Sequence, residues 1–154
     1  MAKKQSRAKT RPKDVPSNTG YNFGWCGIFG HWRPLKDNVD HPQIFGALQI
    51  WAEHKFSLVY GIHYAAIQVW KNVKIVEHSD DNNRGCNFIY GMGDYKHGEL
   101  VVIVKDQFGK STEKTLDIKH KLRVFNPHNK HRVCWYEGLR YSITFYTPKR
   151  AWNF

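Results

Sequence analysis

Two potential metal ligands stand two residues apart in the segment His78-Ser79-Asp80. In an extended segment, side chains at i and i+2 project to the same side, so the imidazole and the carboxylate can approach one ion together. Taken alone the pattern is weak evidence, because a chain with nine His and eight Asp contains one H-x-D by chance about half the time. An exposed polar turn is the alternative interpretation.

A third ligand strengthens the case for a metal site. His131 follows Asp80 by 51 residues and comes shortly after a strand-like run, 123–125. Two His and one carboxylate form a facial triad that leaves three adjacent positions of an octahedral Fe(II) open. A bidentate 2-oxo acid fills two of these positions and O2 fills the third. His128 lies near the same strand end, but its twelve-residue distance from Arg140 makes His131 the preferred ligand.

A cation for the distal carboxylate of such an oxo acid follows at the expected distance. Arg140 stands nine residues after His131, beyond a short turn at 136–138. The planar fork of Arg pairs a carboxylate through two parallel hydrogen bonds. Ser142 lies on the same strand face as Arg140 and can donate a further hydrogen bond.

These segments resemble the Fe(II)- and 2-oxoglutarate-dependent dioxygenases, whose fold is a double-stranded β-helix. The matching part runs from about 66 to 147. The run His78-Ser79-Asp80-Asp81-Asn82-Asn83 resembles the metal loop of that family, and Gly138-Leu139-Arg140-Tyr141-Ser142 resembles its cosubstrate strand, closest to the branch of Tet-like enzymes and base J-binding proteins. His97 departs from the Gly usual there, and Tyr146 replaces the second Arg of alkylation-damage repair dioxygenases, which disfavours that subfamily.

The resemblance implies Fe(II), 2-oxoglutarate and O2 as cofactor and cosubstrates. It implies His78, Asp80 and His131 as metal ligands and Arg140 as the clamp. We further assign Ser142, Asn83 and Tyr90 to the pocket for the cosubstrate. The expected reaction is hydroxylation of a nucleobase or a nucleic-acid-associated group, with decarboxylation of 2-oxoglutarate to succinate. Two alternatives stay open: a protein side-chain hydroxylase of the same fold, and a non-enzymatic, basic nucleic-acid-binding or structural β-sandwich protein.

The elements that must position these residues are mostly strands. One helix is predicted over 41–54, capped by Asp40, with Pro42 in its first turn. Its apolar face comprises Ile44, Leu48, Trp51 and Ala52. Strand-like runs follow at 56–61, 66–76, 87–92, 100–104, 116–126 and 141–147. We therefore expect a mainly β fold with one or two N-terminal helices, a cupin-like jelly roll or double-stranded β-helix.

Composition limits the remaining possibilities. A chain of 154 residues fits one domain at 21–154, preceded by a flexible basic arm at 1–20 that holds six Lys or Arg against one Asp. The net charge of +11 favours nucleic acid as a partner, bound by the arm and the basic surface. No apolar run suits a membrane span or signal peptide. Three Cys argue against a disulfide framework. We expect an intracellular protein, nuclear or cytoplasmic.

Overall fold

The computed structural model describes residues 20–28 and 31–149. The arm predicted at 1–20 therefore lies outside the described residues, except for Gly20, which begins the first strand. Residues 150–154 of the predicted domain also lie outside. The described part is mainly β with two helices, as predicted, and its sheets are antiparallel.

Two helices stand near the start of the described chain, α1 (Lys36–Asp40) and α2 (Pro42–Phe56). The predicted helix is α2, but the predicted cap is wrong. Asp40 ends α1, and the N-cap of α2 is His41, which makes no side-chain capping bond. Pro42 at the first position and left-handed Ser57 after the last explain where α2 begins and ends.

One face of α2 packs on the larger sheet. Ala52 is fully buried, and Leu48 and Trp51 pack against the same core. The prediction for Ile44 is wrong, because this side chain is 45% exposed and Phe45 takes its place in the core. Periodicity defines an apolar stripe, but the crossing of helix and sheet decides which residues at its edge are buried.

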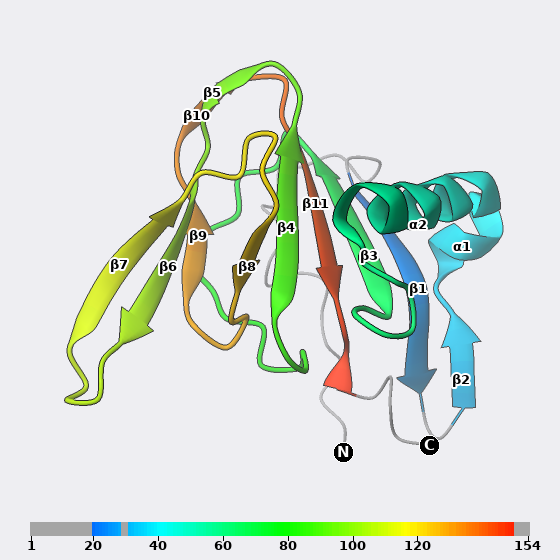
Figure 1. Cartoon of the computed structure of the whole chain (residues 1–154), viewed down its shortest axis with the longest axis horizontal. Coiled ribbons are helices and arrows are strands. Elements are labelled where there is room, and N and C mark those ends of the chain that lie inside the picture. The colour runs from blue at the N-terminus through cyan, green and yellow to red at the C-terminus, as the bar shows by residue number, and fades with distance from the viewer. Residues whose placement is uncertain (1–19, 29–30, 150–154) are drawn as a thin grey trace.

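The larger sheet contains six strands in the order β2-β1-β3-β11-β4-β8. Their bounds are β1 (Gly20–Ile28), β2 (His31–Pro34), β3 (Ala66–Lys71), β4 (Asn87–Met92), β8 (Arg123–Phe125) and β11 (Tyr141–Tyr146). Figure 1 shows α2 lying across this sheet. Phe23, Ile67 and Phe145 project from β1, β3 and β11 into the core beneath the helix.

A smaller sheet and a ribbon stand on the other side. The sheet has the order β7-β6-β9, with β6 (Leu100–Lys105), β7 (Ser111–Leu116) and β9 (His131–Val133). The ribbon pairs β5 (Tyr95–His97) with β10 (Tyr136–Gly138). A second core joins Ile89 of β4 to Leu100 and Val102 of β6. The two sheets thus form a sandwich with α2 on its outer face.

Several predicted strands change in extent. The run 87–92 is confirmed as β4, and 100–104 and 141–147 correspond to β6 and β11 within one residue. The run 66–76 stops at Lys71, and 116–126 keeps only β8. No strand forms at 56–61, where α2 ends in a turn. Among the described residues, no helix is long and apolar enough to cross a membrane.

Candidate metal centre

His78 and His131 lie directly opposite each other on neighbouring extended segments. Their backbones exchange both hydrogen bonds, at 3.1 Å and 2.8 Å. Side chains of such a pair project to one face of the sheet. The two imidazole rings accordingly lie with their centroids 4.3 Å apart. The fold thus brings together two His residues that are 53 positions apart in the sequence.

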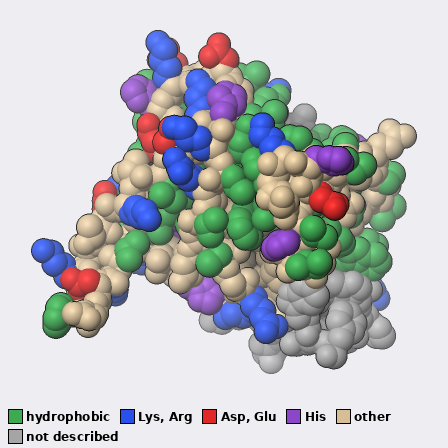
Figure 2. All heavy atoms as spheres, in the orientation of Figure 1, with side chains coloured by type: hydrophobic (Ala, Val, Ile, Leu, Met, Phe, Trp, Pro, Cys, Tyr) green, Lys and Arg blue, Asp and Glu red, His purple; other side chains and the backbone are tan. Residues whose placement is uncertain are grey.

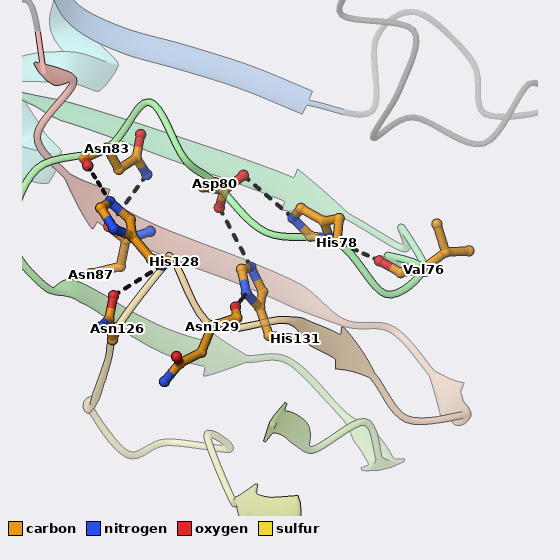
Figure 3. Close-up of polar contacts among 9 residues, drawn as sticks. All are labelled: Val76, His78, Asp80, Asn83, Asn87, Asn126, His128, Asn129 and His131. Carbon is orange, nitrogen blue, oxygen red and sulfur yellow. Dashed lines mark hydrogen bonds and ion pairs between the residues drawn. The ribbon is translucent and has the colours of Figure 1, made fainter. Parts of the chain in front are cut away.

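Both rings present the same nitrogen to Asp80. Nδ1 of His78 bonds the carbonyl of Val76, and Nδ1 of His131 bonds the carbonyl of Asn129, each at 2.8 Å. A carbonyl can only accept, so each Nδ1 donates its hydrogen there and Nε2 is the nitrogen that faces Asp80. The two Nε2 atoms stand 3.5 Å and 3.4 Å from the two oxygens of Asp80 (Figure 3).

These distances suit metal ligands better than hydrogen bonds. A charge-assisted N–H···O bond is about 2.7–2.9 Å long. Ligand atoms held at about 2.0–2.2 Å from one ion stand roughly 3.0–3.5 Å apart, depending on the angle between them. All three ligand atoms lie within 4.8 Å of one another. The carbonyls of Val76 and Asn129 orient the rings, as outer partners of metal-bound His do.

The loop after His78 is fixed by its own backbone. The amide of Asp80 donates to the carbonyl of Pro127, and the amide of Asn83 donates to the carbonyl of Asp80. His128 donates from Nε2 to the carbonyl of Asn83 at 2.7 Å, so it braces the loop. The Asn83 side chain bonds Asn87 at 3.4 Å, a bracing role that differs from the predicted contact with the cosubstrate.

Electrostatics keep the carboxylate ionised. Burial alone would raise the pKa of Asp80, but the hydrogen bonds and charges of the two His rings outweigh it and hold that pKa well below its usual value. Burial would lower the pKa of His78, yet the bonds to Asp80 and to the Val76 carbonyl raise it. His131 is 4% exposed and the Asp80 side chain 32%, so the site opens toward solvent on the Asp80 side.

Arg140 is a buried cation without an acidic partner. It is 1% exposed and precedes β11, where its amide donates to Oδ1 of Asn72. Nη2 donates to the carbonyl of Gly98 at 3.1 Å, and the guanidinium lies over the rings of Tyr95 and Tyr136. In the described part of the chain no carboxylate forms an ion pair with it, and its Nε has no hydrogen-bond partner. Burial lowers the pKa of Arg140.

Tyr95 is a buried neighbour of Arg140 to which the sequence analysis assigned no role. Its hydroxyl is buried and makes no hydrogen bond of good geometry among the described residues, although it lies close enough to the Arg140 guanidinium to interact with it. The hydroxyl occupies the space above Gly91, where a Cβ would lie only 2.3 Å from it. Ser142, 3% exposed, pairs with Gly91 across the strands and so lies beside this space. Only the turn Gly93-Asp94 ahead of an aromatic residue marks Tyr95 in the sequence.

The predicted role of Tyr90 does not fit its position. Its ring packs on Trp51 and Phe56 of α2, with centroids 5.3 Å and 5.1 Å away. Its neighbour Ile89 belongs to the core between the sheets. Because successive strand residues face opposite ways, Tyr90 lies on the helix side of β4, away from the triad.

The inner face of the larger sheet is unusually polar. Phe23, Ile143 and Phe145 face the helix, so the alternating residues face the smaller sheet. Asn22, Gln68 and Thr144 occupy one straight cross-strand row on that face. In the next row Trp70 pairs with Ser142. Asn22 Oδ1 and Trp70 Nε1 are buried without a hydrogen-bond partner in the described chain.

Arg140 and the triad lie at different levels of the sandwich. His131 pairs with Val102, whereas the guanidinium bonds Gly98, four residues along the same chain segment. At about 3.3 Å per residue, the separation along the strand is about 13 Å. A ligand joining the two sites would therefore require the guanidinium to turn from Gly98 toward Ser142.

No protein-family model matches the chain, and a comparison with curated proteins finds no match.

Proposed function

We propose that the protein is an Fe(II)- and 2-oxoglutarate-dependent dioxygenase that acts on a nucleobase or a nucleic-acid-associated group. The observation that carries the proposal is the convergence of two imidazole Nε2 atoms on the carboxylate of Asp80. Two His and one carboxylate with open positions are the ligand set typical of non-haem Fe(II) oxygenases. Iron and 2-oxoglutarate bound there would supply O2 activation and oxidation of a C–H bond.

Strand order supports a double-stranded β-helix. Segment 75–78 extends the smaller sheet beside β9, since the Val133 amide donates to the Ile75 carbonyl and His78 pairs with His131. Apart from β6 and β7, which follow each other in the smaller sheet, successive strands then fall alternately in the two sheets: β3, β4, β8 and β11 in the larger, and 75–78, β6, β7 and β9 in the smaller. The first of these strands pairs with the last, β3 with β11. Such closure is what a jelly roll requires.

Each pocket residue has a role that its surroundings favour. Asp80 stays ionised and the two rings stay oriented, so the triad is ready for a divalent ion. Arg140 would bind the distal carboxylate of 2-oxoglutarate, because it is the buried cation that lacks an acidic partner. The Tyr95 hydroxyl and Ser142 would add hydrogen bonds beside it.

Charge favours a nucleic-acid substrate over a protein side chain. The described residues hold 17 Lys or Arg against 12 Asp or Glu, a net of +5. Arg84, Lys130, Arg132 and Lys149 lie in the segments that bond or adjoin the triad loop and His131, where Glu77 and Asp81 are the nearby acidic residues. The row of Asn22, Gln68 and Thr144 offers the donors and acceptors that a heterocyclic base needs. A duplex base would have to be flipped out, so single strands should react more easily.

Anaerobic titration of the full chain with Fe(II) and 2-oxoglutarate tests the proposal. We expect the weak visible charge-transfer band of the chelate, and succinate formation once air is admitted. Asp80→Ala should abolish both, whereas Asp81→Ala, the adjacent exposed carboxylate, should retain both. A wild-type protein that gives neither band nor succinate contradicts the proposal and favours a non-enzymatic nucleic-acid-binding or structural protein. Turnover with acidic peptides but not oligonucleotides would favour the protein hydroxylase.

A further inference from the structure

The hairpin of β6 and β7 extends well beyond the body of the protein. The two strands pair along six residues each. On its other side β6 is joined to β9 only up to Ile103, whose amide donates to the Lys130 carbonyl. Figure 1 shows the outer half of the hairpin projecting into solvent. The hairpin projects from the end of the smaller sheet that carries His131, because His131 pairs with Val102 just before the free part of the hairpin begins.

The tip of this hairpin is ordered and presents one aromatic ring. Oδ1 of Asp106 accepts hydrogen bonds from the amides of Phe108 and Lys110, both at 2.9 Å. The Gly109 amide donates to the Asp106 carbonyl, and Gly109 adopts φ +80°, which closes the turn. Phe108 is nevertheless 85% exposed, the most exposed large hydrophobic residue of the described chain. The turn therefore holds this ring out in solvent.

Cations flank the ring on both sides. Lys105 ends β6 and Lys110 directly precedes β7, both exposed, and Lys130 lies next to the base of the free part. The acidic groups nearby are already engaged: Asp106 bonds the turn amides, and Glu113 pairs with Arg132 at 2.9 Å. Figure 2 shows hydrophobic atoms at the outer end of the projection with basic side chains beside them.

We propose that this hairpin is a finger that grips single-stranded nucleic acid. Phe108 stacks on an unpaired base, and Lys105 and Lys110 hold the adjoining phosphates. Aromatic platforms combined with basic side chains are how proteins bind single strands without sequence preference. Lys105 stands three residues beyond Val102, about 10 Å along the strand from the level of His131. A strand held by the finger thus passes close to the triad, which extends the proposed function by naming how its substrate is held.

The test compares two fluorescent 15-mers, oligothymidylate and an abasic strand of equal length, by anisotropy with the full-length protein. Phe108→Ala should weaken binding of oligothymidylate at least about fivefold and leave the abasic strand unaffected, since stacking needs a base. Phe108→Trp should bind oligothymidylate more tightly than the abasic strand, as the wild type does, because it keeps an aromatic ring. Trp135→Ala removes an exposed aromatic residue of the β5–β10 end and serves as the matched control without effect.

The lysines are tested through salt. Lys105→Gln with Lys110→Gln should lower the slope of log Kd against log[salt] by about 1.4, because each single-strand phosphate contact contributes about 0.7. Lys96→Gln, in β5, is the control. The proposal would be overturned if Phe108→Ala weakened binding of both oligonucleotides equally. It would also be overturned if Phe108→Ala left binding unchanged but converted a dimer of the wild type to a monomer in sedimentation, because Phe108 would then be a contact between two copies of the chain. Because binding is measured without turnover, failure of the oxygenase assignment leaves this result unaffected.

Discussion

Replacing Arg140 separates a cosubstrate clamp from a structural arginine. Arg140→Lys keeps a positive charge but loses the planar fork, and Arg140→Met loses both. Losing one hydrogen bond to a charged group costs about 1.5–3 kcal/mol, so Arg140→Lys should bind 2-oxoglutarate about 10- to 150-fold more weakly. Arg140→Met leaves a buried carboxylate unpaired, which costs about 3–5 kcal/mol and predicts a loss of at least about 150-fold.

Stability should respond quite differently from affinity. Arg140→Met removes the bond to the Gly98 carbonyl, which costs about 1–3 kcal/mol. It also removes a charge that is 1% exposed and has no ion pair in the described chain, and relief of that desolvation is worth a similar amount or more. The two effects offset each other, so the free energy of unfolding should change by less than about 1 kcal/mol.

The assay measures 2-oxoglutarate affinity by anaerobic titration and unfolding by urea. Pyruvate, which lacks the distal carboxylate, should bind the wild type much more weakly than 2-oxoglutarate does. This difference in affinity should be much smaller for Arg140→Met. Arg123→Met, an arginine of β8 outside the pocket, is the control. If Arg140→Met binds 2-oxoglutarate like the wild type but loses several kcal/mol of stability, the guanidinium is a structural group and the nine-residue spacing from His131 is coincidence.

Three further predictions concern the metal, the pocket and the arm. Fe(II) at 100 times its Kd should add about 2.7 kcal/mol of stability, an increase in Tm of about 5–10 °C in anaerobic thermal unfolding, and His78→Ala should show no increase. Unchanged melting of the wild type would refute the metal site. Tyr95→Phe removes a buried, unpartnered hydroxyl, so unfolding in urea should show equal or higher stability while 2-oxoglutarate binds several-fold more weakly. Lower stability would instead mean that the hydroxyl has a structural partner. Deletion of 1–20 removes six cations and should reduce the single-strand salt slope by up to about 4; an unaltered slope would show that the arm does not contact phosphate.

The helix and the pair His78 and Asp80 were accessible to sequence analysis because both depend on local spacing. His78 and Asp80 needed only an extended segment to share a face. The pairing of His78 with His131 depends on register between distant strands, which spacing suggests but does not determine. Strand β7 was missed because Ser111–Leu116 is almost wholly polar and exposed, so it carries no apolar alternation. Backbone pairing with β6 is what holds it.

The residues predicted to surround the cosubstrate were harder to identify from the sequence than the three candidate metal-binding residues. Tyr90 and Tyr95 stand in the neighbouring strands β4 and β5, and the sequence analysis assigned the first to the pocket. The fold turns Tyr90 toward α2 and brings the Tyr95 hydroxyl above Gly91, where no side chain competes for the space. Which face of a strand lies between the sheets depends on how both sheets pack, so the sequence of one strand alone does not determine it.

The distribution of unpartnered polar atoms favours a binding site over a purely structural sandwich. Asn22 Oδ1, Trp70 Nε1, Tyr95 Oη and Arg140 Nε are buried without hydrogen-bond partners in the described residues, and so is the Tyr64 hydroxyl in the core beneath α2. Each such group costs about 1–3 kcal/mol, so together they approach the whole stability of a small domain. Apolar residues at these positions would make a more stable sandwich. We infer that complementary groups of a bound ligand or of ordered water offset this cost.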